Sequence, residues 1–410
     1  MKKGIILFCM SIIVASCSND NLFNEVYHVK KRSVHRITAE QAQQNALEFV
    51  NKIHTTRRSS EIITVSSIMP IVNNLTITRS EGDSICIDTL LYAINFEDNR
   101  GFILASADDR REPVIAYVEQ GRFDEDDYTC LTDSISNDST NNSGYNAFMR
   151  NVLDIYLHDA GIYHKNIDID IDWTGPTTHS YEYEHMFPLL KTKWSQEDYK
   201  QYCNDYATGC AATAISQICS FLENPTFVSW SSGSNNGSCM IDWNRINAEC
   251  EANDGQVISD DLKDQVAHLM RYWGLMFNTN YGWPNSYASV SYAVSALQNL
   301  GYNATSLESF NVENVVESLK LDGHIVFMSG KNSDLEGHGW VVDGYILKKL
   351  GNMKSYYLHC NWGNGGGEHC KNGYFLSSML DDSRSPDYAD DAITRSSQYI
   401  YELKTSVISK

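Results

Sequence analysis

The first part of the chain combines one helical pattern with short strand-like runs. Thr38-Ala39-Glu40-Gln41 is typical of a capping box, with Ile37 available as a hydrophobic staple, and apolar residues follow at helical spacing to about residue 54. A second helix is expected over 145–160. Between them, runs of β-branched and aromatic residues separated by turn residues predict a small antiparallel meander, over 91–96, 102–106 and 113–118. Together these elements predict a small α+β domain, residues 37–165.

The pattern changes at residue 187, from which helices come first and strands follow. Helical periodicity and apolar strand runs in this order predict a second α+β domain of two layers over 187–410. Its expected helices are 261–273, 286–300 and 312–321, and its expected strands are 325–330, 339–345, 356–362 and 374–376. Two polar stretches are predicted to be exposed, a loop over 124–143 and a linker over 166–186.

The N-terminus predicts export. Met1-Lys2-Lys3 is basic, the apolar run that follows is too short to span a bilayer, and residues 1–16 therefore form a signal peptide. Val14-Ala15-Ser16-Cys17 resembles a bacterial lipobox, which implies lipidation of Cys17 and a tether over 17–36; the alternative is an ordinary secretory peptide. The expected location is the cell envelope, as an outer-membrane lipoprotein, or the periplasm or exterior after processing. A lipidated Cys17 would anchor the chain to a membrane.

Composition and cysteine spacing argue against nucleic acid, structural zinc and cofactors as partners. The 410 residues carry a formal net charge of −20, which argues against nucleic acid because phosphate binding requires clustered Lys and Arg. Export permits disulfides among the 11 cysteines, and Cys239/Cys250 and Cys360/Cys370 are close enough in sequence to be candidates. Because no C-x-x-C spacing occurs, we expect no structural zinc, and no metal or cofactor is expected.

The sharpest local signal is Thr208-Gly209-Cys210, followed by a run of small and apolar residues. The Thr-Gly pair breaks regular structure, so Cys210 is expected in the first turn of a thin, buried helix. A helix N-terminus lowers the pKa of a thiol and favours the nucleophilic thiolate. The alternative is a small thiol that merely packs in a helix, because free cysteine is among the most buried residue types.

A nucleophilic cysteine needs a base and a group that orients the base. His338 lies between glycines at the start of an apolar strand, although His324, His359 and His369 compete on similar grounds. Asn361 can accept a hydrogen bond from one imidazole nitrogen, and Trp362 can shield that bond from water. A cysteine on a helix, with His and Asn on strands about 130–150 residues downstream, is the order of papain-like peptidases.

With these residues in place, the second domain resembles the streptopain family of papain-like cysteine peptidases. The first domain resembles the family's pro-domain. The chain differs in two places: Asn364 stands where the family often has Trp, and Gly339-Trp340 follows His338 where Ala-Phe is more usual. The resemblance rests on ordered segments at 188–196, 208–214, 242–243, 337–344, 361–363 and 373–375, and in the first domain at 39–42, 101–102, 106–110 and 113–117.

The resemblance implies a role for each site residue. Cys210 would be the nucleophile and His338 the general base and acid. Gln196 would donate to the oxyanion with the Cys210 backbone N–H, a contribution of several kcal/mol in such reactions. Asn361 and Trp362 would orient and shield His338. The chain would be a zymogen that acts on proteins and peptides, with its own pro-domain as an intramolecular inhibitor until cleavage within 124–186.

Two other functions fit the same residues. A catalytically silent, surface-anchored binding protein could retain a peptidase fold, although the joint presence of Cys210, His338 and Gln196 argues against it. A transglutaminase or amidase would use the same Cys-His chemistry with a different acceptor for the acyl group.

Overall fold

The structure of the chain is a computed structural model. It describes residues 36–54, 63–72, 89–132, 143–163, 181–282, 286–331, 337–380 and 401–410. The predicted signal peptide, with Cys17, and most of the predicted linker lie outside these residues.

Most strands join one 12-stranded sheet, in the order β1-β2-β3-β4-β13-β12-β11-β10-β14-β8, with β5 paired to β11 and β9 to β14. A separate two-stranded sheet contains β6 and β7. The strands are β1 Val65–Val72, β2 Thr89–Phe96, β3 Phe102–Ser106, β4 Val114–Val118, β5 Glu182–Met186, β6 Phe227–Ser232, β7 Asn235–Met240, β8 Asn303–Ala304, β9 Glu308–Ser309, β10 Ile325–Lys331, β11 Gly337–Leu350, β12 Met353–Asn361, β13 Gly373–Leu376 and β14 Tyr401–Ser409.

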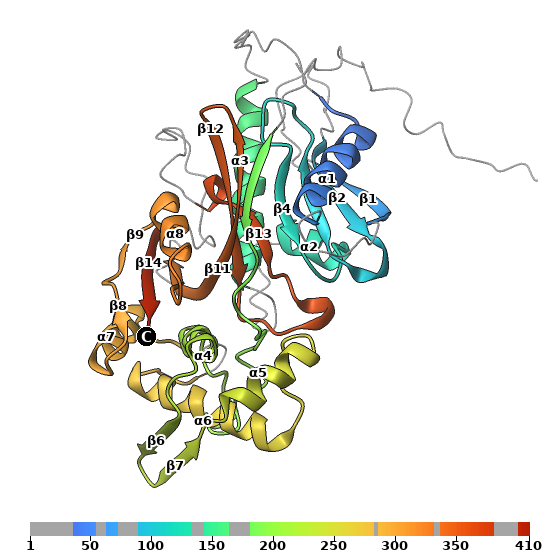
Figure 1. Ribbon diagram of the computed structural model, residues 1–410. Helices are drawn as coiled ribbons and strands as arrows, with labels where there is room; N and C mark the ends of the chain where they lie inside the picture. The colour runs from blue at the N-terminus through green and yellow to red at the C-terminus, as the bar shows by residue number, and fades with distance from the viewer. Residues whose placement is uncertain are drawn as a thin grey trace, which may run out of the picture.

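Helices cover the large sheet and divide the buried side chains into two cores. One core lies among α1, α3, the N-terminal strands and β11–β13, and the other lies among α4–α7, β10 and β11. Figure 1 shows α4, α5 and α6 gathered at the lower end of the view, beyond the long strand β11. The α-helices are α1 Ala39–His54, α2 Glu125–Thr132, α3 Ser143–Tyr163, α4 Cys210–Leu222, α5 Trp243–Ala252, α6 Asp260–Met276, α7 Val290–Asn299 and α8 Val312–Leu319.

The N-terminal region forms the predicted helix and meander. Thr38 and Gln41 cap α1 reciprocally: the Thr38 N–H donates to Gln41 Oε1 at 2.8 Å, and the Gln41 N–H donates to Thr38 Oγ1 at 3.3 Å. The apolar face of α1 is buried against β2, β3 and β4. The α+β class is therefore confirmed for this region.

The two regions share the large sheet, through antiparallel pairing of β4 with β13. Tyr117 lies opposite Tyr374 in this register, and their rings stack with centroids 6.3 Å apart. The boundary between the predicted domains is therefore crossed by backbone hydrogen bonds as well as by a common core.

Two segments expected to be irregular contain regular structure. The predicted loop over 124–143 begins with α2, whose first turn is capped by the Asp124 carboxylate as it accepts hydrogen bonds from Asp126 and Asp127 N–H. The last residues of the predicted linker are β5, which pairs with β11 from Met186 opposite Tyr345 to Glu182 opposite Lys349. Long-range pairing, which local composition does not encode, explains this second difference.

The disulfide candidates are not formed in the structure. Cys239, Cys250, Cys360 and Cys370 are all free thiols. Cys239 lies on the partly exposed β6–β7 hairpin, whereas Cys250 packs in the core beside Trp194. Proximity in sequence was therefore a poor guide to pairing, because adjacent elements turn these side chains into different surroundings.

Among the described helices, none combines the length and the apolar character that crossing a membrane requires. Within the same residues, no three His, Cys, Asp or Glu side chains gather in a way that could hold a metal ion.

Candidate active site

Cys210 is the first residue of α4, as predicted. Gly209 precedes it with φ 92°, a conformation that favours glycine, and the Gly209 carbonyl accepts a hydrogen bond from the Thr213 N–H at 3.0 Å. Residues 211–220 are all buried, so α4 lies between the sheet and the other helices. The small side chains of Ala211, Ala212 and Ala214 permit this close packing.

Strand β11 brings His338 to the start of α4. The Gly339 N–H, next to His338 in the chain, donates to the Cys210 sulfur. A Cβ added at Gly339 would lie 3.9 Å from the Ala211 Cα and only 2.9 Å from the Phe327 ring, so glycine permits this approach. The structure therefore brings Cys210 and His338 together from positions far apart in the sequence.

The His338 ring is turned toward the backbone of Trp362. Its Nε2 lies 3.2 Å from the Trp362 carbonyl oxygen, and its ring stacks on Trp340 with centroids 5.9 Å apart. His338 is only 4% exposed, and this burial lowers its pKa to about 4. The imidazole is therefore neutral at pH 7 in this arrangement.

The Cys210 thiol is neutral as well, contrary to the prediction from its helix position. Burial raises the pKa of Cys210, and the hydrogen bonds from the Gly339 and Ala211 N–H groups only partly offset this effect. The helix N-terminus is present, but desolvation of the thiolate has the larger effect here.

The backbone of Gln196 is hydrogen-bonded to the segment that immediately precedes the predicted nucleophile. Its carbonyl oxygen accepts a hydrogen bond from the Thr208 N–H at 2.9 Å, just before Gly209 and Cys210. Its neighbour Ser195 forms an isolated β-bridge with Asn364, in the glycine-rich loop after β12. Asn364, where the family often has Trp, therefore lies next to the Gln196 segment.

Asn361 is close to these residues, but its amide does not contact His338. Its Nδ2 donates to the Thr192 carbonyl oxygen at 2.9 Å, and its Oδ1 accepts from Gln217 at 3.2 Å and from the Gly363 N–H at 3.2 Å. In this structure Asn361 therefore fixes the backbone around the site, and the expected hydrogen bond to the imidazole is not formed.

The first turn of α3 lies against both the Trp362 ring and the His338 ring. Trp340, Trp362 and Phe375 form an aromatic row, with ring centroids 5.2 Å and 5.1 Å apart along it. A Cβ added at Gly144, in the first turn of α3, would lie 2.4 Å from the Trp362 ring and 2.9 Å from the His338 ring. The start of α3 therefore lies directly on the predicted base.

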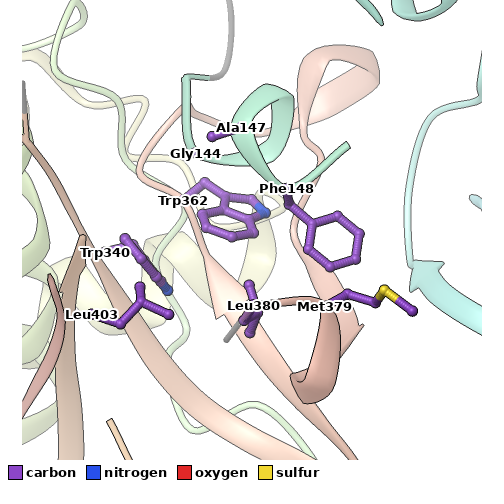
Figure 2. Close-up of a pocket in the computed structure, with 8 residues that line it drawn as sticks. All are labelled: Gly144, Ala147, Phe148, Trp340, Trp362, Met379, Leu380 and Leu403. Atoms are coloured by element: carbon purple, nitrogen blue, oxygen red, sulfur yellow. The ribbon is translucent and has the colours of Figure 1, made fainter. Parts of the chain in front are cut away.

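An apolar cavity continues from this contact. Figure 2 shows Phe148 and Ala147 of α3 facing Trp362 across it. Its lining is Gly144, Ala147, Phe148, Trp340, Trp362, Met379, Leu380 and Leu403.

Sequence reasoning missed two residues that support the site. Gln217, on α4, accepts a hydrogen bond from the Trp194 N–H at 2.9 Å and also contacts Asn361. Asp343, on β11, is fully buried and lies 2.6 Å from Nδ1 of His359. Each is a polar residue within an otherwise apolar helix or strand, and that signal could have identified both.

The competing histidines lie elsewhere. His359 pairs with Asp343, and His324 follows α8 at the start of β10. His369 belongs to the short 3-10 helix Gly367–His369. Of the four candidates, His338 is the one whose neighbour contacts the Cys210 sulfur.

Comparison with known proteins finds a match for each of the two regions of the chain. Residues 181–375 match the model of the peptidase C10 family, and residues 34–136 match the model of the Spi protease inhibitor. None of the curated proteins compared with the chain matches it.

Two solved structures of Prevotella intermedia proteins are similar in fold. Prointerpain A is 19% identical with a TM-score of 0.50, over 78% of this chain and 96% of that chain. Active wild-type interpain A, a cysteine protease, is 17% identical with a TM-score of 0.37, over 55% of this chain and 94% of that chain. The likeness to prointerpain A confirms the papain-like fold preceded by a pro-domain. The chain belongs to the peptidase C10 family and is a cysteine peptidase with an N-terminal inhibitor domain.

Proposed function

We propose that the chain is an exported cysteine endopeptidase, made as a zymogen, in which Cys210 is the nucleophile and His338 the general base and acid. The observation that carries this assignment is the contact of the Cys210 sulfur with the Gly339 N–H, next to His338. Gln196, whose carbonyl oxygen accepts a hydrogen bond from the Thr208 N–H, would donate its side-chain amide to the oxyanion together with the Cys210 N–H. Trp362 would shield the imidazole, and Asn361 would orient it after activation.

The chemistry follows from these roles. The Cys210 thiolate attacks the scissile carbonyl carbon, an S–C bond forms, and the C–N bond breaks as His338 protonates the leaving amine. Water, deprotonated by the same imidazole, then attacks the acyl-enzyme and releases the acid and the free thiol. Protein and peptide substrates fit this reaction.

The pro-domain would suppress the reaction by holding both groups neutral. The start of α3 covers His338, whose Nε2 lies 3.2 Å from the Trp362 carbonyl oxygen. Cleavage within 124–186, on the C-terminal side of α3, would separate α3 from the peptidase domain and uncover His338 and Cys210.

Replacing the nucleophile tests the assignment. Cys210→Ala should give a folded chain that neither cleaves casein nor processes itself, before or after trypsin treatment. The matched control is Cys239→Ala, which removes another partly exposed thiol on a remote hairpin and should leave activity unchanged. Casein hydrolysis by the Cys210→Ala protein at the wild-type rate would refute the assignment.

We further propose that Cys17 carries a lipid that anchors the protein in the cell envelope, as the lipobox-like Val14-Ala15-Ser16-Cys17 suggests. Palmitate labelling of the expressed full chain should be lost in Cys17→Ser, and the protein should move from the membrane fraction to the soluble one. Equal labelling of both forms would exclude Cys17 as the anchor.

A further inference from the structure

The segment that carries Gln196 is irregular, and buried polar side chains hold it in place. From Phe187 to Trp194 it belongs to no strand or helix. Along this segment, the Leu190 N–H donates to Asp343 Oδ2 at 2.9 Å, and the Thr192 carbonyl accepts from Asn361 at 2.9 Å. We call residues 187–196 the oxyanion arm. Its position relative to Cys210 depends on these side-chain contacts.

Asp343 is aimed at the arm by an irregularity in its strand. The register between β11 and β12 shifts between Val342 and Gly344, which leaves Asp343 as the extra residue of a bulge. The bulge frees the Asp343 carbonyl oxygen to accept from the Leu189 N–H at 3.0 Å, while its carboxylate accepts from Leu190. Asp343 therefore binds the arm through both backbone and side chain.

His359 balances the charge of Asp343. Its Nδ1 lies 2.6 Å from Asp343 Oδ1, and both residues are buried, at 4% and 0% exposed. A buried carboxylate without a partner would cost several kcal/mol, so the contact with His359 stabilises Asp343 and holds its side chain in place. On the other side, His359 Nε2 lies 3.3 Å from Glu119 Oε2 of the pro-domain.

We propose that Asp343 and His359 are positioning residues for peptide hydrolysis, which hold the oxyanion arm and thereby aim Gln196 at the reacting carbonyl. Neither residue touches the reacting atoms. The proposal rests on the function proposed above for Cys210 and Gln196. Since Glu119 belongs to the pro-domain, its release leaves His359 with Asp343 as its only carboxylate partner among the described residues.

The protonation state of His359 then makes the kcat of the enzyme depend on pH. Although burial alone would lower its pKa, Asp343 and then Glu119 raise the pKa of His359 to about 9 in the zymogen. Without Glu119 we expect a lower value, so that the mature enzyme loses the charge at moderately alkaline pH. The titratable groups around His359 are Asp343 on β11, Glu119 after β4, Tyr374 on β13, Cys360 on β12, and Lys193 and Cys370 at the cavity that it shares with them.

The test uses the full chain activated by trypsin, with two variants at one position. In His359→Asn, the side-chain amide N–H takes the position from which Nδ1 donates to Asp343. In His359→Gln, the amide N–H lies near the position of Nε2 instead. We expect His359→Gln to lower kcat about tenfold with KM unchanged within about twofold, because misplacement of a reacting group costs up to about 10²-fold. His359→Asn keeps the donor to Asp343 but carries no charge, so at every pH it should show the lowered kcat that the wild type reaches only at alkaline pH, without the alkaline decline.

A second measurement distinguishes a positioning role of His359 from a general loss of active-site structure in the variants. The rate at which iodoacetamide alkylates Cys210 depends on the Cys-His pair and not on the oxyanion arm, so it should stay at the wild-type value in both variants. A fall in alkylation that parallels the fall in kcat would overturn the proposal, as would wild-type kcat and pH profile in both variants.

The wild-type enzyme gives a test that needs no variant. Its kcat should decline over the pH range in which the His359 ring loses its proton by NMR, and a kcat that is flat over that range would overturn the proposal. An activated wild-type enzyme that hydrolyses no peptide would contradict the proposed function instead. The two failures are therefore distinguishable.

Discussion

At the scale of single residues, the two predicted catalytic groups have pKa values displaced in the directions that disable them. Burial raises the pKa of the Cys210 thiol and lowers that of His338 to about 4. Formation of the thiolate–imidazolium pair would require a proton to move from the sulfur to the imidazole. The raised pKa of Cys210 and the lowered pKa of His338 both oppose this transfer. We therefore expect latency to be chemical as well as steric.

The reactivity of Cys210 should consequently depend on pH differently in the two forms. In the wild-type zymogen, alkylation of Cys210 should be slow at pH 7 and should become faster only at alkaline pH. A thiol with a raised pKa loses its proton only at alkaline pH, and the thiolate is the form that is alkylated. After activation, pairing with His338 should make the thiol reactive from mildly acidic pH. Rates of iodoacetamide labelling at Cys210, followed by peptide mass spectrometry between pH 5 and pH 10, check this. Identical profiles in both forms would contradict it.

The sequence predicted Cys210 and His338 because their spacing, together with Asn361, follows the order of papain-like peptidases. Neither local signal was sufficient alone, since a cysteine in a thin helix is often only packed and three other histidines compete with His338. It predicted the wrong direction for the pKa of Cys210, because the burial comes from segments distant in sequence. It also did not predict that the Asn361 amide binds Thr192 and Gln217. Such contacts depend on three elements meeting, and no local pattern encodes that.

At the scale of elements, helices and strands differ in how well the local sequence predicts them. The amphipathic α1, α6 and α8 and the apolar β3 and β10 were predicted close to their observed bounds. β1, the β6–β7 hairpin and β14 were not predicted. β14, for example, is defined by pairing with β10, with Ile325 opposite Ile408, and not by a strong pattern of its own. Helices form from local periodicity, whereas strands need a partner.

The close approach of α3 to the active site gives a prediction for Gly144. Gly144→Val would place atoms about where the Trp362 and His338 rings lie, so the first turn of α3 must move away. We expect the variant zymogen to be labelled at Cys210 by iodoacetamide about tenfold faster at pH 7, which corresponds to about 1.4 kcal/mol of lost latency.

The control for this variant lies in the same helix. Asn146→Val adds a β-branched residue at a partly exposed position of α3 and should leave labelling of the zymogen unchanged. Slow labelling of Gly144→Val, equal to that of the wild type, would show that the contact does not maintain latency.

At the scale of the whole molecule, acidic side chains of the pro-domain meet cations of the peptidase region along the shared sheet. Asp127 of α2 pairs with Lys371 at 2.8 Å, Glu112 pairs with Lys348 at 2.9 Å, and Glu119 faces His359. The pairs are buried or partly buried, so each charge depends on its partner for stability. We therefore expect these pairs to contribute to the docking of the pro-domain on the peptidase region.

The Lys371–Asp127 pair allows this to be tested as a thermodynamic cycle, in the Cys210→Ala background so that no processing occurs. The side chains are 11% and 8% exposed, and burial raises the pKa of Asp127 even though Lys371 opposes the shift. Removal of one partner from such a pair costs about 3 kcal/mol, so Lys371→Met should lower the free energy of unfolding by about that amount. In the double variant Lys371→Met/Asp127→Leu most of the loss should be recovered, because no buried charge then lacks a partner. Urea unfolding of the four proteins gives the coupling energy. A coupling near zero would mean that the pair does not contribute to docking, and that β4–β13 pairing and the apolar core hold the pro-domain without it.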